Sequence, residues 1–307
     1  MPLMTATGGS LAAVSFAPSE TRTVSSLLIL EILPIPTKRL PERCLRARRI
    51  SANVNGTMTK SWLTDVVTRE RWQAAQAWER EHWVNTQQLR AKYGKNLVWR
   101  LLSAVGAVPR YRGDDWNHWW KARFRNYDFL PPVVERALEV GCGPYTNVRL
   151  MLDRCQIGHL FLSDPLIKTY ANFKLTIVSE MYRRGGCTLD DHPLEELPFA
   201  PAHFDLVIMI NVLDHVQDAR RCMDNLVRAV APGGLLIIGQ DLTSEQDLNA
   251  LKDDPGAIGH PIKLEGEWFE PYLHKAFAHI IYDVLRREES RDPRHHCGAL
   301  VFAGRKL

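Results

Sequence analysis

Short apolar runs alternate with helical patterns over the second half of the chain. The apolar runs predict strands at 137–140, 160–163, 206–210 and 235–239. Helices are predicted between these strands near 147–154, 167–183 and 219–230. Because parallel strands need a crossover that is usually a helix, the alternation predicts a doubly wound, mostly parallel α/β sheet. Two last runs, 278–285 and 297–303, flank a charged turn and predict a closing antiparallel hairpin.

The preceding part of the chain has helical patterns rich in tryptophan. One runs from 61 to about 107, and a second ends at Pro131 and Pro132. In the second, aromatic side chains recur at spacings of three and four and share one helix face: Trp116, Trp119, Trp120, Phe124 and Tyr127. We interpret this stripe as packing on the main domain. A compatible alternative is that part of it, with Arg125, covers a ligand pocket.

The first 57 residues are rich in Ser, Thr, Pro and Arg, with one apolar patch at 26–36 that Glu31 and Pro34 interrupt. We interpret them as a disordered leader, or as sequence upstream of a true start at Met58. An Arg-rich, acid-poor segment is also typical of an organellar transit peptide, which is the alternative. The predicted organisation is therefore a leader (1–57), a helical N-terminal cap (58–132) and the α/β domain (133–307).

Charge and cysteine usage narrow the function classes. The formal net charge of +4 is carried by the leader, so the rest of the chain is formally neutral, which disfavours a nucleic-acid surface. Six cysteines without a CxxC pair predict reduced thiols and a cytoplasmic protein. The longest apolar run, 206–213, is too short to span a membrane. We expect no nucleic-acid or membrane partner, and the sequence leaves a homodimer open.

The strongest chemical signal is the turn after the first predicted strand. Glu139 lies near the end of that strand, and Gly141 and Gly143 follow, so the backbone can approach a ligand closely and the next helix can point N–H groups at it. The second predicted strand ends at Asp164, about 20 residues further on, which is the spacing of a ribose-hydroxyl acceptor. Together they predict a nucleoside pocket.

Four segments in this order resemble the class I S-adenosylmethionine-dependent methyltransferases. They are EVGCG at 139–143, Asp164-Pro165, the pair EELPF (195–199) and HFDLV (203–207), and APGGL at 231–235. The resemblance covers 137–307. It implies a seven-stranded Rossmann-like sheet, S-adenosylmethionine as cofactor, and the following cofactor-binding residues: Glu139, Gly141, Cys142, Gly143, Asp164, Pro165, Glu195 and Asn211.

The resemblance also implies individual roles. Gly141 and Gly143 would lie against the methionine and ribose of the cofactor, and Glu139 would reach its amino group or order the loop. Asp164 would accept hydrogen bonds from both ribose hydroxyls, with an N-cap to the next helix as the alternative. The chain departs from the family at Tyr145, where a third glycine is usual. It also departs at 193, where Pro193 stands near a usual Asp and leaves the adenine contact to Glu195 or to backbone groups.

Methyl transfer is an in-line displacement, and a hydroxyl acceptor also needs a base. Asp214 and His215 follow the fourth predicted strand, where doubly wound sheets bind ligands, and could supply the base or hold the acceptor. His260, in a GHP segment similar to one in family members that act on sugars or small metabolites, is a second candidate. The alternatives are a helix start for the first pair and packing for His260.

A metal site is not expected. His295, His296 and Cys297 are ligand types for zinc, but adjacent residues in a turn rarely point at one ion.

We therefore predict an S-adenosylmethionine-dependent methyltransferase that acts on a small molecule or glycan, at oxygen. Aromatic-rich helices beside a neutral domain favour sugar rings or polyketides as acceptors. The alternatives are N- or C-methylation of a metabolite, which needs no strong base, and an inactive partner subunit that binds the cofactor. RNA methylation is disfavoured by the charge.

Overall fold

The computed structural model describes residues 60, 62–93, 98, 115–174, 176–250, 255–293 and 296–307. The predicted leader lies outside the described residues, as do Trp99 and Cys44. The described cysteines are all free thiols. Among the described helices, none has the length and apolarity needed to cross a bilayer.

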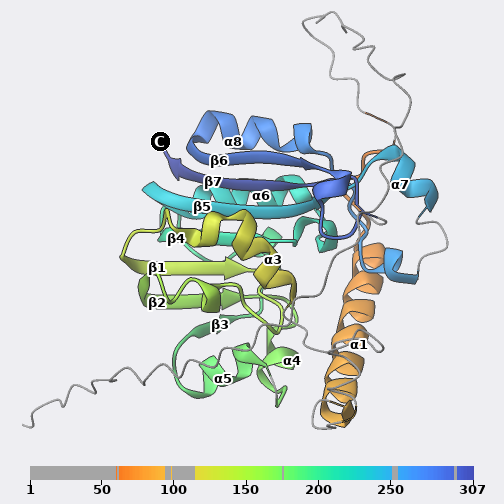
Figure 1. Cartoon of the computed structure of the whole chain (residues 1–307), viewed down its shortest axis with the longest axis horizontal. Coiled ribbons are helices and arrows are strands. Elements are labelled where there is room, and N and C mark those ends of the chain that lie inside the picture. The colour runs from red at the N-terminus through yellow and green to blue at the C-terminus, as the bar shows by residue number, and fades with distance from the viewer. Residues whose placement is uncertain are drawn as a thin grey trace, which may run out of the picture. The chain divides into compact units, whose positions relative to one another are not determined.

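Seven strands form one sheet in the order β3-β2-β1-β4-β5-β7-β6 (Figure 1). The strands are β1 (Val133–Val140), β2 (Gln156–Ser163), β3 (Thr188–Asp190), β4 (Phe204–Ile210), β5 (Val230–Leu242), β6 (Phe277–Arg286) and β7 (Gly298–Lys306). The first five are parallel, and β7 runs antiparallel between β5 and β6. The predicted doubly wound sheet with a reversed edge is confirmed.

Helices of the described chain cover both faces of this sheet. They are α1 (Arg69–Tyr93), α3 (Asp115–Arg123), α4 (Ile167–Ala171), α5 (Ile177–Arg183), α6 (Ala219–Ala229), α7 (Glu245–Ala250) and α8 (Glu270–Ala276). Along β4, Leu206 and Ile208 pack with the aromatic residues of α3, while Val207 and Met209 pack with α6 and α8. Both faces of β4 are therefore buried, which explains why its sequence is almost continuously apolar.

The predicted helix at 147–154 is wrong. The segment forms only a short 3-10 turn, η2 (Val148–Leu150), followed by further turns. The chain is buried almost continuously from Cys142 to Met151, apart from Gly143 and Arg149, so it has no polar face with which an amphipathic helix could meet solvent. The glycine turn is thus not followed by a helix N-terminus.

Two other boundaries also differ. The helix expected over 167–183 is split into α4 and α5, because the Thr176 side chain caps a new helix by accepting from the backbone N–H of Ser179. The expected turn at 231–234 lies within β5, where Gly233 has a φ of 73° and the pairing with β4 shifts register. The PGG sequence is therefore an irregularity in a longer strand.

The aromatic stripe of α3 and the turn after it packs on the sheet, as expected for most of its members. Trp120, Phe124 and Tyr127 are fully buried, whereas Trp116 is 49% exposed. The Trp120 ring lies over Gly239 of β5, where an added Cβ would come within 2.8 Å of it. Glycine at that position lets the indole reach the carboxyl end of the sheet.

Candidate functional site

A cavity of about 340 Å³ opens at the carboxyl ends of β1, β2 and β4. This is where open parallel sheets bind ligands, and the volume falls within the range of about 300–1,000 Å³ that ligand pockets occupy. The glycine turn and Asp164 form its floor, and α1 stands across the strand ends beside it (Figure 1). Of the cofactor residues expected from the sequence, all except Glu139 line this cavity.

The glycine turn is held by the neighbouring strand. The backbone N–H groups of Gly141 and Cys142 both donate to the carbonyl of Ser163, at 2.7 and 3.4 Å. Gly141 and Gly143 have φ angles of 59° and 55°, a region that side-chain-bearing residues rarely adopt. The turn therefore presents bare backbone to the cavity.

The two glycines differ in what a side chain would meet, which gives a matched test. At Gly141 an added Cβ would lie 2.4 Å from a methyl of the buried Val212, whereas at Gly143 it would meet open space. We expect Gly143→Ala to lose about 1–2 kcal/mol of unfolding free energy from backbone strain alone. Gly141→Ala should lose more, by at least about 1 kcal/mol. Urea unfolding of both variants measures the difference, and equal losses would contradict the contact with Val212.

Asp164 connects the end of β2 to the glycine turn. One carboxylate oxygen accepts from the backbone N–H of Gly143 at 3.1 Å and the other from that of Leu166 at 2.8 Å. Burial raises the pKa of this carboxyl to about 6, against the effect of these two hydrogen bonds. The N-cap alternative considered from the sequence is wrong, because the N-cap of α4 is Leu166 and no side chain caps that helix. The bond from Leu166 instead closes the turn before α4, and the Asp164 side chain also lines the cavity.

Glu139 points away from the cavity and orders the loop. It is 1% exposed and accepts hydrogen bonds from the Thr146 hydroxyl and from the backbone N–H groups of Asn147 and Val148. Burial raises the pKa of its carboxyl, an effect that these hydrogen bonds oppose. Of the two roles expected for Glu139, this geometry favours loop ordering.

Glu195 and Asn211 line the cavity with their side chains already hydrogen-bonded. Glu195 accepts from the backbone N–H groups of Gln217 and Asp218, at 2.7 and 3.0 Å, just before α6. Asn211 has a φ of 58°, and its side-chain oxygen accepts from the backbone N–H of Asp241 at 3.0 Å. These hydrogen bonds hold the loops that follow the strands, and the two side chains form part of the cavity wall.

Tyr145 is explained by the helices that cover the turn. Its hydroxyl accepts from the Gln87 side chain of α1 at 2.8 Å, and its carbonyl accepts from the Asn117 amide of α3. The aromatic ring lies 5.8 Å from that of Trp83. Tyr145, which stands where a third glycine is usual, thus connects both α1 and α3 to the glycine turn.

The cavity's outer wall comes from those helices, a contribution that the sequence predicted only for α3. Lining side chains from α1 are Trp72, Gln76, Trp78, Glu79, His82 and Trp83, and α3 adds Trp116, Asn117 and Trp120. The predicted lid residue Arg125 does not line the cavity. In its place Arg291 lies there, stacked 3.7 Å from the centre of the Trp116 ring and paired with Asp241 at 2.8 Å.

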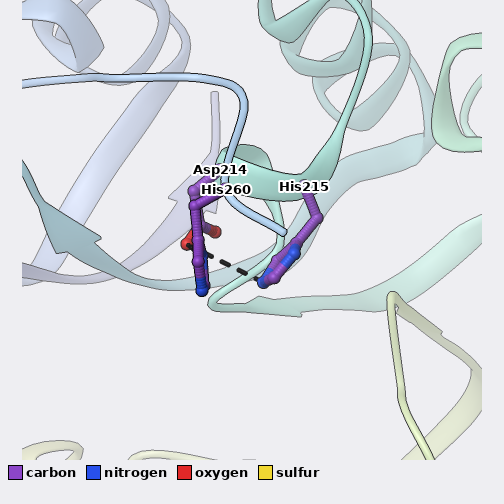
Figure 2. A group of neighbouring side chains, drawn as sticks. All are labelled: Asp214, His215 and His260. Carbon is purple, nitrogen blue, oxygen red and sulfur yellow. Dashed lines mark hydrogen bonds and ion pairs between the residues drawn. The ribbon is translucent and has the colours of Figure 1, made fainter. Parts of the chain in front are cut away.

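Asp214, His215 and His260 lie side by side (Figure 2), and the two histidines line the cavity. Asp214 and His215 belong to the 3-10 turn η4 (Leu213–His215), and His260 follows η5 (Pro255–Ile258). His260 Nδ1 lies 2.7 Å from Asp214 Oδ2, and the two imidazole ring centres are 4.4 Å apart. All three predicted catalytic candidates are thus in one cluster, although the two histidines are 45 positions apart in the chain.

The charged groups of this cluster shift one another's pKa values in the direction that favours their ionised forms. Burial alone would raise the pKa of Asp214, but the charge of His215 and the hydrogen bond with His260 hold it well below its ordinary range. Burial would lower the pKa of His215, but Asp214 and Glu79 of α1 raise it above its ordinary value. The Asp214 carboxylate is therefore ionised at neutral pH, and the surrounding field favours positive charge.

The His-Cys cluster near the C-terminus is described only in part. His295 lies outside the described residues, and His296 Nε2 is 3.6 Å from Asp241 Oδ2.

Residues 138–238 match a family model described as a methyltransferase domain, a stretch that runs from β1 to β5. No curated protein matches the sequence significantly.

Solved structures with a similar fold have low sequence identity. The N-methyltransferase NodS from Bradyrhizobium japonicum WM9, in complex with S-adenosyl-L-homocysteine, is 17% identical; the alignment covers 72% of this chain and 98% of that one (TM-score 0.45). The YcgJ protein of Bacillus subtilis is 14% identical, with 62% and 98% covered (TM-score 0.46). These likenesses concern the fold alone. The matched family model gives the assignment: residues 138–238 form a methyltransferase domain.

Proposed function

We propose that the chain transfers a methyl group from S-adenosylmethionine to a hydroxyl of a small molecule or glycan. The observation that carries this proposal is the Asp214–His260 pair beside the cavity, because hydroxyl acceptors need a proton acceptor and metabolite N-methylation needs no strong one. We further propose that the helices α1 and α3 act as a cap over the acceptor, because their side chains line the outer wall of the cavity.

The cavity fits the cofactor. Gly141 and Gly143 leave backbone exposed on its floor, and an added Cβ at Gly143 would point into open space. The Asp164 carboxylate lines the cavity with acceptor capacity beyond its two backbone hydrogen bonds, since a carboxylate has about four lone-pair sites. We assign to Asp164 the ribose hydroxyls and to the glycine turn, with Cys142, the methionine end.

The remaining cofactor residues have supporting roles in this proposal. Pro165, Glu195 and Asn211 form walls of the cavity, and Glu195 faces the expected adenine region with its carboxylate already engaged by the backbone before α6. The adenine edge is therefore expected to be read by backbone groups near Glu195. Glu139 acts on the cofactor through the loop that it holds.

The bound cofactor supplies an electrophilic methyl group on a sulfonium. His260 donates its Nδ1–H to ionised Asp214, which leaves Nε2 as the proton acceptor. In this arrangement the acceptor's hydroxyl proton moves to His260 Nε2 as its oxygen attacks the methyl carbon. Asp214 holds the imidazole in the required tautomer and stabilises the imidazolium that forms.

The side chains of α1 and α3 that line the cavity support the proposed chemical class of the acceptor. Its lining is dominated by tryptophan side chains from α1 and α3, and the cation Arg291 is already paired with Asp241. Flat apolar walls with few free charges suit sugar rings and aromatic natural products. This wall and the formally neutral body give no track of basic side chains for RNA.

The proposal is tested by two measurements on the full chain. Calorimetry with S-adenosylmethionine should detect one site, and incubation with a panel of phenols, glycosides and amines should give a phenol or glycoside product heavier by one methyl group. Absence of cofactor binding would overturn the proposal. Cofactor binding with transfer only to amines would replace O-methylation by N-methylation, and binding without transfer to any acceptor class would favour an inactive partner subunit.

A further inference from the structure

Three metal-ligand side chains converge where the fold brings two distant segments together. Asp214, His215 and His260 each offer one ligand atom, and these atoms all lie within 4.8 Å of one another. Figure 2 shows the carboxylate and the two imidazoles next to one another, with His215 beside the overlapping Asp214 and His260. No other such group occurs among the described residues.

We propose that Asp214, His215 and His260 form a binding site for a divalent first-row transition metal ion such as Zn²⁺. Two imidazoles with one carboxylate are a donor set that suits these ions, and three protein ligands leave a coordination position open. Because the cluster borders the cavity, that position would face a bound acceptor.

The distances are compatible with one ion. With bonds of about 2.1 Å at tetrahedral angles, an ion holds two ligand atoms about 3.4 Å apart. Asp214 Oδ2 lies 2.7 Å from His260 Nδ1 and 3.8 Å from His215 Nε2, so the first pair must separate and the second must approach, each by less than about 1 Å. The two histidine atoms lie within 4.8 Å of each other, so a small ring rotation is enough to complete the set.

Neighbouring groups orient two of the three ligands. His215 Nδ1 is 2.8 Å from the carbonyl of Gly259, and donation to this carbonyl leaves the Nε2 lone pair available. The Gln240 amide donates to Asp214 Oδ1 at 3.0 Å and leaves Oδ2 for the ion. Metal-binding histidines are generally fixed in this way by a carbonyl or carboxylate on the other ring nitrogen.

The local field also favours a cation. Glu79 of α1 lies 3.8 Å from His215 Nδ1 and adds a second carboxylate near Asp214. An ion would take the place of the proton that Asp214 and His260 share. Binding of the ion does not depend on the proposed function, but its role in catalysis does. If the ion held the acceptor hydroxyl, that hydroxyl would release its proton to water instead of to His260.

The test measures metal binding without cofactor or acceptor. The full chain is freed of metal by dialysis against a chelator, and Zn²⁺ is titrated by calorimetry. We expect one equivalent to bind, and His260→Gln and Asp214→Asn to weaken the affinity at least tenfold each. His192→Gln is the matched control, because His192 also pairs with a carboxylate, Asp190, at 2.6 Å but has no second histidine.

Absence of a one-equivalent site would overturn the inference, as would equal affinities in all variants that circular dichroism shows to be folded. The proposed function fails separately. Methyl transfer by chelated protein that binds no Zn²⁺ would overturn the metal site and keep O-methylation, whereas Zn²⁺ binding by a chain that transfers no methyl group would do the reverse.

Discussion

Replacing His260 by glutamine is expected to slow methyl transfer by about 10²–10⁴-fold while S-adenosylmethionine still binds. The glutamine amide can still donate a hydrogen bond to Asp214, which His260 now contacts at 2.7 Å, but it cannot accept a proton at neutral pH. The loss should therefore lie in kcat, because the step that needs a proton acceptor is affected and the cofactor's contacts are not. The initial rate of S-adenosylhomocysteine formation, with the hydroxyl acceptor found in the panel, measures it.

Two further variants distinguish the effect of the Asp214–His260 pair on kcat from a general effect of losing a histidine. Asp214→Asn removes the charge that fixes the His260 tautomer and should cause a comparably large loss of kcat. His159→Gln, which removes an exposed histidine of β2 that does not line the cavity, should leave kcat within a few-fold of the wild type. A full rate in His260→Gln would exclude this residue as the base and favour N- or C-methylation.

The strands and the cofactor turn could be predicted from the sequence because their signals are local. A strand buried on both faces is an apolar run such as β4, and a turn with positive φ requires glycine at 141 and 143. Asp214 and His215 were also found from their position just after a strand. In each case the residues that make the feature are neighbours in the chain.

Features that depend on distant segments could not be predicted. His260 is separated from Asp214 by 45 residues, and the fold of this connection brings the two together. The cluster of Asp214, His215 and His260 therefore has no short, regular ligand spacing that could be recognised in the sequence. The α1 side chains Glu79 and Trp83 enter the cavity because the helix crosses the strand ends. The helix expected at 147–154 is absent for a similar reason, because distant residues surround the segment. Its apolar side chains pack with the aromatic residues of α3, and the backbone N–H of Asn147 donates to Glu139 of β1.

Asp164→Asn is expected to weaken S-adenosylmethionine binding by about 10–100-fold. Hydrogen bonds to an ionised group contribute about 1.5–3 kcal/mol, and an amide offers the ribose one acceptor oxygen where the carboxylate offers two. Each 1.4 kcal/mol corresponds to a tenfold change of Kd. Calorimetry at pH 7.5 measures the change. Asp191→Asn is the control, because Asp191 pairs with Lys168 on the exposed surface and its loss removes the same charge without touching the cavity.

The pH dependence of the affinity identifies the group. Since the pKa of Asp164 in the free protein is raised to about 6 from its ordinary value near 3.8, the carboxylate is ionised above pH 6 and takes up a proton as the pH falls below it. The wild-type affinity should therefore be constant above about pH 7 and fall by up to about tenfold for each pH unit below 6. In Asp164→Asn this fall should disappear, because the amide does not titrate. A wild-type affinity that stays constant down to pH 5 would show that the ribose hydroxyls are not bound by an ionised Asp164.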